Sequence, residues 1–216
     1  MKKNTLSAIL MTLFLFISCN NGGPELKGNE VAKSDGTVLD LSKISSKIKN
    51  ASAFAAGVKE IHALVKSVGE FAKGIGNKVT QNTGVIDADA GGNNNGQIIV
   101  GAYSLISGLK TQVEELGKKD GISDGLKEKL DDVSKKGTAF LDKVKADAEL
   151  CKKDVTDENA KKALDVNNAS KEKGAKELGD LNTAVDGLLT AANGEVEAAI
   201  KELTAAPAKP ATPVKP

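Results

Sequence analysis

Apolar residues recur every three or four positions along most of the chain, a spacing that indicates amphipathic α-helices. The pattern predicts long helices over residues 39–75, 98–117, 122–151 and 175–203. Four long helices joined by short connections pack as antiparallel neighbours. We therefore expect an all-α fold, an elongated antiparallel bundle of four long helices with one short helix added.

The short helix is predicted from its first turn. Thr156 is a suitable N-cap, and Asp157 and Glu158 place negative charge where the helix dipole favours it. Between the first two long helices, residues 76–97 are rich in Gly and Asn. Such a stretch predicts a loop, in which a short β-hairpin is expected at residues 78–80.

The two ends of the chain lack the helical period and divide the sequence further. Residues 1–18 carry two early lysines and then an apolar run shorter than the ~20 residues that span a bilayer, which is typical of a signal peptide. Residues 19–37 contain several Gly and Asn and predict a flexible tether. The helical bundle domain is expected over 38–205, and residues 206–216 form a Pro/Lys-rich tail.

Cys19 follows a small residue at the end of the apolar run, an arrangement that resembles the lipobox of bacterial lipoproteins. Cys19 is therefore the predicted lipid attachment residue. Each buried CH₂ contributes ~0.8 kcal/mol, so two or more acyl chains hold a protein stably. Cys151 would then have no partner, which excludes a disulfide framework. It is either a small buried hydrophobe on a helix face or a bridge between the subunits of a dimer.

The composition argues against catalysis and against nucleic-acid binding. All 30 basic residues are Lys, they nearly balance 29 acidic residues, and His62 is the only histidine. Bidentate recognition of phosphate or guanine uses Arg, and most nucleophile and metal sites use His together with partners. We expect no enzymatic activity, no metal and no cofactor besides the lipid. His62 itself is expected to be buried or to contact a dimer partner.

Several adjacent lysines could bind a sulfated polysaccharide. An even number of helical passes returns the chain to the end where it began, so residues 76–97 and 152–170 should share the opposite end. The best candidates for a polyanion site are therefore the lysines of that end, although acids at 154, 157 and 158 weaken the case. These candidates are Lys152, Lys153, Lys161 and Lys162.

Stretches throughout the chain resemble one group of spirochaetal lipoproteins. The leader, residues 1–21, and the segment Val155-Thr-Asp-Glu-Asn-Ala-Lys-Lys-Ala163 are similar to the variable small proteins of relapsing-fever spirochaetes and to outer surface protein C. Further similar stretches are residues 30–41, 65–68, 173–178 and 194–205. The resemblance covers essentially the whole chain.

The resemblance implies a helical, palmitate-bearing lipoprotein on the extracellular face of the outer membrane, commonly a homodimer. Serial replacement of such proteins evades host antibodies and contributes to virulence, and some members bind host glycosaminoglycans or plasma and tick proteins. A competing interpretation is a periplasm-facing lipoprotein that carries a small apolar ligand in its bundle. The shortage of polar and aromatic residues on the apolar stripes argues against that alternative.

Overall fold

The structure is a computed structural model that describes residues 26–32, 38–89 and 91–204. The signal peptide, Cys19 and the Pro/Lys-rich tail lie outside the described residues. The chain divides into two compact units, one from residues up to Asn50 and from Val196 onward, the other from Ala51–Glu195. Helices α2 (Leu41–Phe71) and α6 (Ala175–Thr204) contribute residues to both units.

The smaller unit combines a two-stranded sheet with the first turns of α2 and the last turns of α6. Strands β1 (Glu30–Ala32) and β2 (Val38–Asp40) are antiparallel. The Asp40 carboxylate accepts a hydrogen bond from the Lys43 backbone N–H at 3.1 Å, at the start of α2. Strand β1 lies within the segment expected to be tether, and its regular structure comes from pairing with β2, which the hydrophobic period does not reveal.

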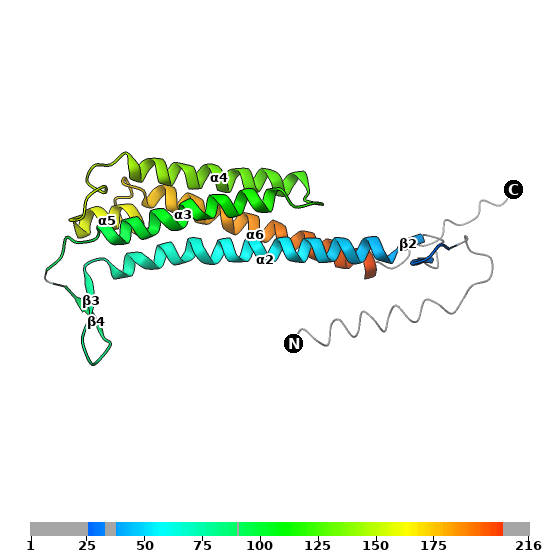
Figure 1. The fold of residues 1–216 in the computed structure, drawn as a ribbon, viewed down its shortest axis with the longest axis horizontal. Helices are drawn as coiled ribbons and strands as arrows, with labels where there is room; N and C mark the ends of the chain where they lie inside the picture. The colour runs from blue at the N-terminus through cyan, green and yellow to red at the C-terminus, as the bar shows by residue number, and fades with distance from the viewer. Residues whose placement is uncertain (1–25, 33–37, 90, 205–216) are drawn as a thin grey trace. The chain divides into compact units, whose positions relative to one another are not determined.

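The larger unit is a bundle of α-helices, shown in Figure 1. Residues from 51 onward in α2 lead through the short 3₁₀ helix η1 (Ala72–Gly74) to the loop before α3 (Gly96–Gly117). Helix α4 (Asp124–Lys145), helix α5 (Asp157–Leu164) and the part of α6 up to residue 195 complete the unit. The predicted all-α bundle with a short additional helix is confirmed.

Contacts at two glycines of this bundle show that α2 and α3 are antiparallel. The Cα of Gly57, near the middle of α2, faces Leu116 at the end of α3, whereas Gly74 faces Ile98 at the start of α3. A methyl group at position 57 would lie 2.7 Å from a Leu116 methyl carbon, so only glycine allows this approach without a shift.

The core of the larger unit is one cluster of buried aliphatic side chains and Phe residues. Every long helix of the unit supplies residues to it, and so do α5 and the loop residues Leu150 and Val155. Burial of this apolar surface is the main force that holds the bundle together. Among the described residues, no helix contains an apolar stretch long enough to cross a membrane.

One predicted helix start, with Thr156 as the N-cap, is confirmed in atomic detail, and one predicted helix end is wrong. Ser123 and Thr156 accept hydrogen bonds from the backbone N–H groups of Leu126 and Asn159, at 3.3 and 3.2 Å. The helix expected to reach residue 151 ends at Lys145 instead.

The early end of α4 follows from the side chain of Asp147. Its carboxylate accepts a hydrogen bond from the Glu149 backbone N–H at 2.9 Å and forms an ion pair with Lys173 at 2.7 Å. These bonds hold the chain in turns rather than in a further helical turn. Cys151 consequently lies exposed in a turn, and the expectation of a buried thiol on a helix face is wrong.

Candidate functional surface

One end of the larger unit brings together the segments that sequence analysis expected to meet. The backbone N–H groups of Asn95 and Gly96 donate to the carbonyls of Val155 and Lys153, each at 3.2 Å. The loop before α3 therefore lies against the loop before α5. We call this end, formed by residues 76–89, 91–96 and 146–174, the hairpin end; residues 118–123 lie at the other end of the unit (Figure 1).

The most exposed part of the hairpin end is the predicted β-hairpin. Strands β3 (Asn77–Val79) and β4 (Ile86–Ala88) pair antiparallel, with Val79 opposite Ile86. These two side chains are 69% and 67% exposed, and Val85 is 52% exposed. Large apolar residues are seldom left in water in a group unless the surface has a use, so the hairpin is the first candidate for contact with other molecules.

The four lysines proposed for polyanion binding lie at the hairpin end, but two of them already have acidic partners. Lys152 Nζ lies 2.8 Å from Glu149, and this hydrogen bond raises the pKa of Lys152. Lys162 lies 2.8 Å from Glu158 and 3.2 Å from Glu172, which raises its pKa in the same way.

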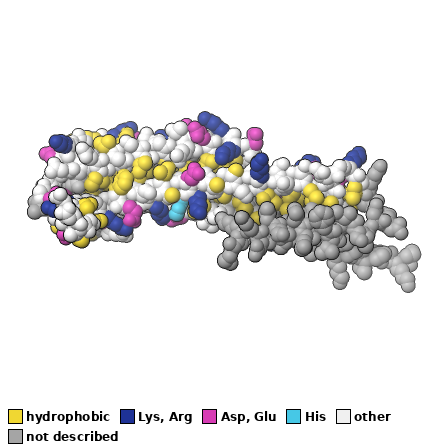
Figure 2. Space-filling view, turned by 60° about the horizontal axis from the view of Figure 1, so that its bottom comes forward, with side chains coloured by type: hydrophobic (Ala, Val, Ile, Leu, Met, Phe, Trp, Pro, Cys, Tyr) yellow, Lys and Arg dark blue, Asp and Glu magenta, His cyan; other side chains and the backbone are white. Residues whose placement is uncertain are grey.

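The remaining two lysines are better placed for an outside anion. Lys153 and Lys161 are exposed and form no ion pair within the described ranges. Figure 2 shows that acidic and basic side chains are interspersed over the face that it presents. The four lysines do not form a purely basic patch, because Glu149, Glu158 and Glu172 lie among them.

His62 pairs within its own chain. Its Nε2 lies 2.9 Å from Asp186 Oδ1 in α6, and Lys66 Nζ lies 3.3 Å from the other oxygen of that carboxylate. The imidazole is 28% exposed, so it is neither fully buried nor free of partners. This arrangement ties α2 to α6 on the surface of the bundle.

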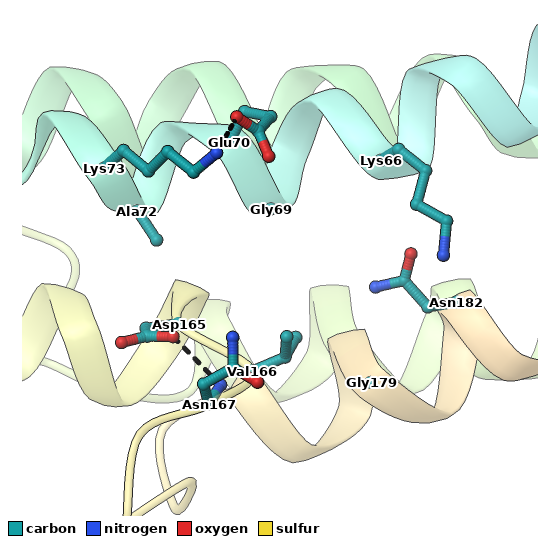
Figure 3. A pocket seen from close by; sticks show the side chains of 10 residues that line it. All are labelled: Lys66, Gly69, Glu70, Ala72, Lys73, Asp165, Val166, Asn167, Gly179 and Asn182. Carbon is teal, nitrogen blue, oxygen red and sulfur yellow. Dashed lines mark hydrogen bonds and ion pairs between the residues drawn. The ribbon is translucent and has the colours of Figure 1, made fainter.

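A cleft of about 490 Å³ lies between the end of α2, the connection from α5 to α6, and α6 itself. Figure 3 shows its lining, with Lys73 paired to Glu70 on one wall and Asp165 accepting a hydrogen bond from the Asn167 backbone on the other. Gly69 lies on the α2 side and Gly179 on the α6 side, and an added Cβ at either position would touch nothing within 4 Å.

The residues that line this cleft are more often polar than apolar. Six of the ten lining residues carry charged or amide side chains, whereas sites for small apolar ligands are lined mainly by hydrophobic and aromatic groups. Within residues 26–32, 38–89 and 91–204, no group of three or more His, Cys, Asp or Glu is placed to hold a metal ion. The cleft therefore offers little support for the periplasmic carrier of an apolar ligand.

Comparison with known proteins identifies the family to which the chain belongs. Residues 38–209 match a protein family described as "Lipoprotein". Variable small protein 11 of Borrelia hermsii is 52% identical over 209 residues, which cover 96% of this chain and 99% of the relative. Outer surface protein C of Borreliella burgdorferi is 44% identical over the full length of both chains.

The fold and these relatives define a helical surface lipoprotein. A solved structure, that of Variable Small Protein 1 of Borrelia turicatae, superposes with a TM-score of 0.71 at 46% identity and covers 76% of this chain and 99% of that one. The chain belongs to the lipoprotein family that contains the variable small proteins and outer surface protein C. The predicted family membership is confirmed.

Sequence reasoning missed two residues that shape the hairpin end. Asn95 is 5% exposed and is the buried polar side chain among the described residues. Its place in a run of asparagines predicts an exposed loop instead. From the sequence, Asp157 is a first-turn acid that weakens the polyanion site, and no role in holding the hairpin is predicted for it. The sequence signals available were the neighbouring glycines at 76 and 92, which leave room for a carboxylate but do not say which one.

Proposed function

We propose that this protein is a variable surface antigen, held on the extracellular face of the spirochaete outer membrane by acyl chains on Cys19. The names of its relatives, which include outer surface proteins, support the location. The lipobox-like sequence before Cys19 supports the anchor. Two or more acyl chains would be needed for stable attachment.

The observation that carries the proposal is the contrast between the exposed hairpin and the closed core. All described residues from Gln81 to Asp89 are exposed, and the apolar members of the hairpin do not belong to the core cluster. Exposed loops tolerate substitution far better than packed interiors. The hairpin end could therefore change between variants while the bundle stays the same, as antigenic variation and escape from host antibodies require.

Binding to other molecules forms a second part of the proposal. A homodimer is proposed, and the exposed thiol of Cys151 would be accessible for a bridge between subunits. Host glycosaminoglycans, or plasma and tick proteins, are proposed as ligands of the hairpin end. For a sulfated chain, Lys153 and Lys161 are the better anchors, because Lys152 and Lys162 already have acidic partners.

The deciding experiment is protease treatment of intact cells, with a periplasmic protein as a marker of membrane integrity. We expect the wild-type protein to be degraded while the marker survives. A Cys19→Ala variant should lose its association with cells and its labelling by radioactive palmitate. A Cys151→Ala variant removes the other cysteine and should behave as wild type in both measurements.

Protection of the wild-type protein until the outer membrane is opened would contradict surface display and would favour a periplasmic lipoprotein. Retention of Cys19→Ala on cells would contradict the lipid anchor. Electrophoresis without reductant, with Cys151→Ala as the control, tests the bridge between subunits separately.

A further inference from the structure

Two short segments join the β3–β4 hairpin to the bundle, and we call them its legs: Gly76 before β3 and residues 91–95 after β4. Both legs contact one carboxylate, that of Asp157 in the first turn of α5. Its Oδ1 accepts hydrogen bonds from the Asn95 side-chain amide at 2.8 Å and from the Asn93 backbone N–H at 3.3 Å. Both donors belong to the leg that leads from the hairpin to α3. The carboxylate therefore binds this leg from a helix more than sixty residues further along the chain.

The other oxygen of Asp157 fits against glycines in both legs. A Cβ added at Gly76, in the leg that enters the hairpin, would clash with Asp157 Oδ2, and one added at Gly92 would lie 3.3 Å from it. Gly76 also has a φ of +71°, which side chains rarely adopt. Both legs thus leave room for the carboxylate.

Beyond these legs, the chain is held by contacts that do not involve Asp157. Ile75 is 2% exposed and belongs to the core. On the other side, the Asn95 and Gly96 backbones are bonded to Val155 and Lys153. Between these two points, the β3 and β4 backbones are hydrogen-bonded to each other. At the base of the hairpin, the Asp89 backbone N–H donates to the Gly76 carbonyl at 2.9 Å.

We propose that Asp157 is the positioning residue of the hairpin: its carboxylate holds residues 76–89 and 91–94 in one orientation, and without it they separate from α5 as a local unit while the bundle stays folded. Hydrogen bonds to an ionised carboxylate are stronger than those between neutral groups. Few other contacts hold the hairpin, because its residues are exposed. Loss of the Asp157 carboxylate should therefore raise the rate of local opening of the hairpin without unfolding the bundle.

The test compares Asp157→Ala with Glu158→Ala in the full chain. Both variants remove one carboxylate from the first turn of α5, so their effects on the helix dipole are matched. Glu158 is exposed and pairs with Lys162, away from the hairpin contacts given above. Asp157→Asn, which keeps an acceptor oxygen but loses the charge, should give an intermediate result.

Two measurements report the opening. Amide hydrogen exchange of hairpin peptides should become about tenfold faster or more in Asp157→Ala, with exchange in α3 and α4 unchanged and Glu158→Ala equal to wild type. Trypsin should cut faster after Lys78, which is the only Lys or Arg in residues 76–94. Exchange of the hairpin that stays at the wild-type rate, or that rises equally in α3 and α4, would overturn the proposal.

Wild-type protein supplies a test if Asp157→Ala does not fold. In low concentrations of denaturant, the hairpin amides should exchange through an opening that leaves the α3 and α4 amides protected. Exchange of the hairpin only on global unfolding would overturn the proposal. These measurements use the isolated protein, so their failure would leave surface display untouched, and protection of the protein on cells would leave the role of Asp157 untouched.

Discussion

Apolar residues meet opposite surroundings in the α3–α4 pair and in the β3–β4 hairpin of the same unit. Ile106 and Leu109 of α3 are completely buried, whereas Val79 and Ile86 of the hairpin are more than two-thirds exposed. Burial of a large apolar side chain contributes ~1.5–3 kcal/mol, so the helices carry the stability and the hairpin contributes little. Stability and exposure to other molecules therefore depend on different segments of the same unit.

The largest effect is expected from the aromatic residue at the centre of the bundle. Phe140→Ala should lower the free energy of unfolding by about 3–5 kcal/mol, because it removes a fully buried ring and leaves a cavity. Urea denaturation followed by circular dichroism measures this change. Val100→Ala in α3, where the side chain is 65% exposed, is the control and should change stability by less than ~0.5 kcal/mol. Equal effects of the two variants would contradict the assigned core.

A second effect is expected where the hairpin end meets the bundle. In Gly96→Ala the new methyl group would clash with the backbone carbonyls of Lys152 and Lys153, which cannot turn aside as a side chain can. We expect a loss of about 2–3 kcal/mol. Gly108→Ala, in an open position of the same helix, should instead gain about 0.5–1 kcal/mol through helix propensity. Thermal unfolding of both variants would show whether the signs differ as expected.

A third effect depends on pH and concerns the loop that ends α4. Burial acts to raise the pKa of Asp147, but hydrogen bonds from Lys173 and the Glu149 backbone outweigh it and hold the pKa below its ordinary value. A lowered pKa stabilises the folded state above the unfolded pKa of about 3.9, and this stabilisation is lost as the pH falls through the folded value.

Asp147→Asn should therefore cost about 1–2 kcal/mol at neutral pH, and the difference from wild type should shrink as the pH falls below about 4. Urea midpoints at a series of pH values measure it. Asp142→Asn, which breaks an exposed pair with Lys145, is the control and should change little. A deficit of Asp147→Asn that stays constant down to pH 2 would disagree with an ionised carboxylate in the folded state.

The smallest effect is expected in the hairpin itself. The double change Val79→Thr with Ile86→Thr keeps two β-branched residues in paired strands and removes only exposed apolar atoms. Global stability should change by less than ~0.5 kcal/mol. A loss comparable to that of Phe140→Ala would show that the hairpin is part of the core and would weaken the case for a displayed, variable segment.

Features that depend on neighbours in the chain can be predicted from the amino-acid sequence. The helical stripes, the caps at Ser123 and Thr156 and the turn-rich hairpin segment follow from local spacing and local hydrogen bonds. Glu158 and Lys162 also have the four-residue spacing of partners within one helix, α5, so their ion pair could have been predicted from the sequence.

Features that join distant segments of the chain depend on tertiary packing. His62 meets Asp186 across 124 positions, and Asn95 meets Asp157 across 62. Periodicity says which face of a helix is buried, but not which polar residue of another segment will lie opposite a given side chain. The end of α4 before Cys151 has the same origin, because the apolar period continues there while Asp147 pairs with Lys173, 26 residues away. Long-range pairing of this kind depends on how the helices pack, which local spacing does not specify.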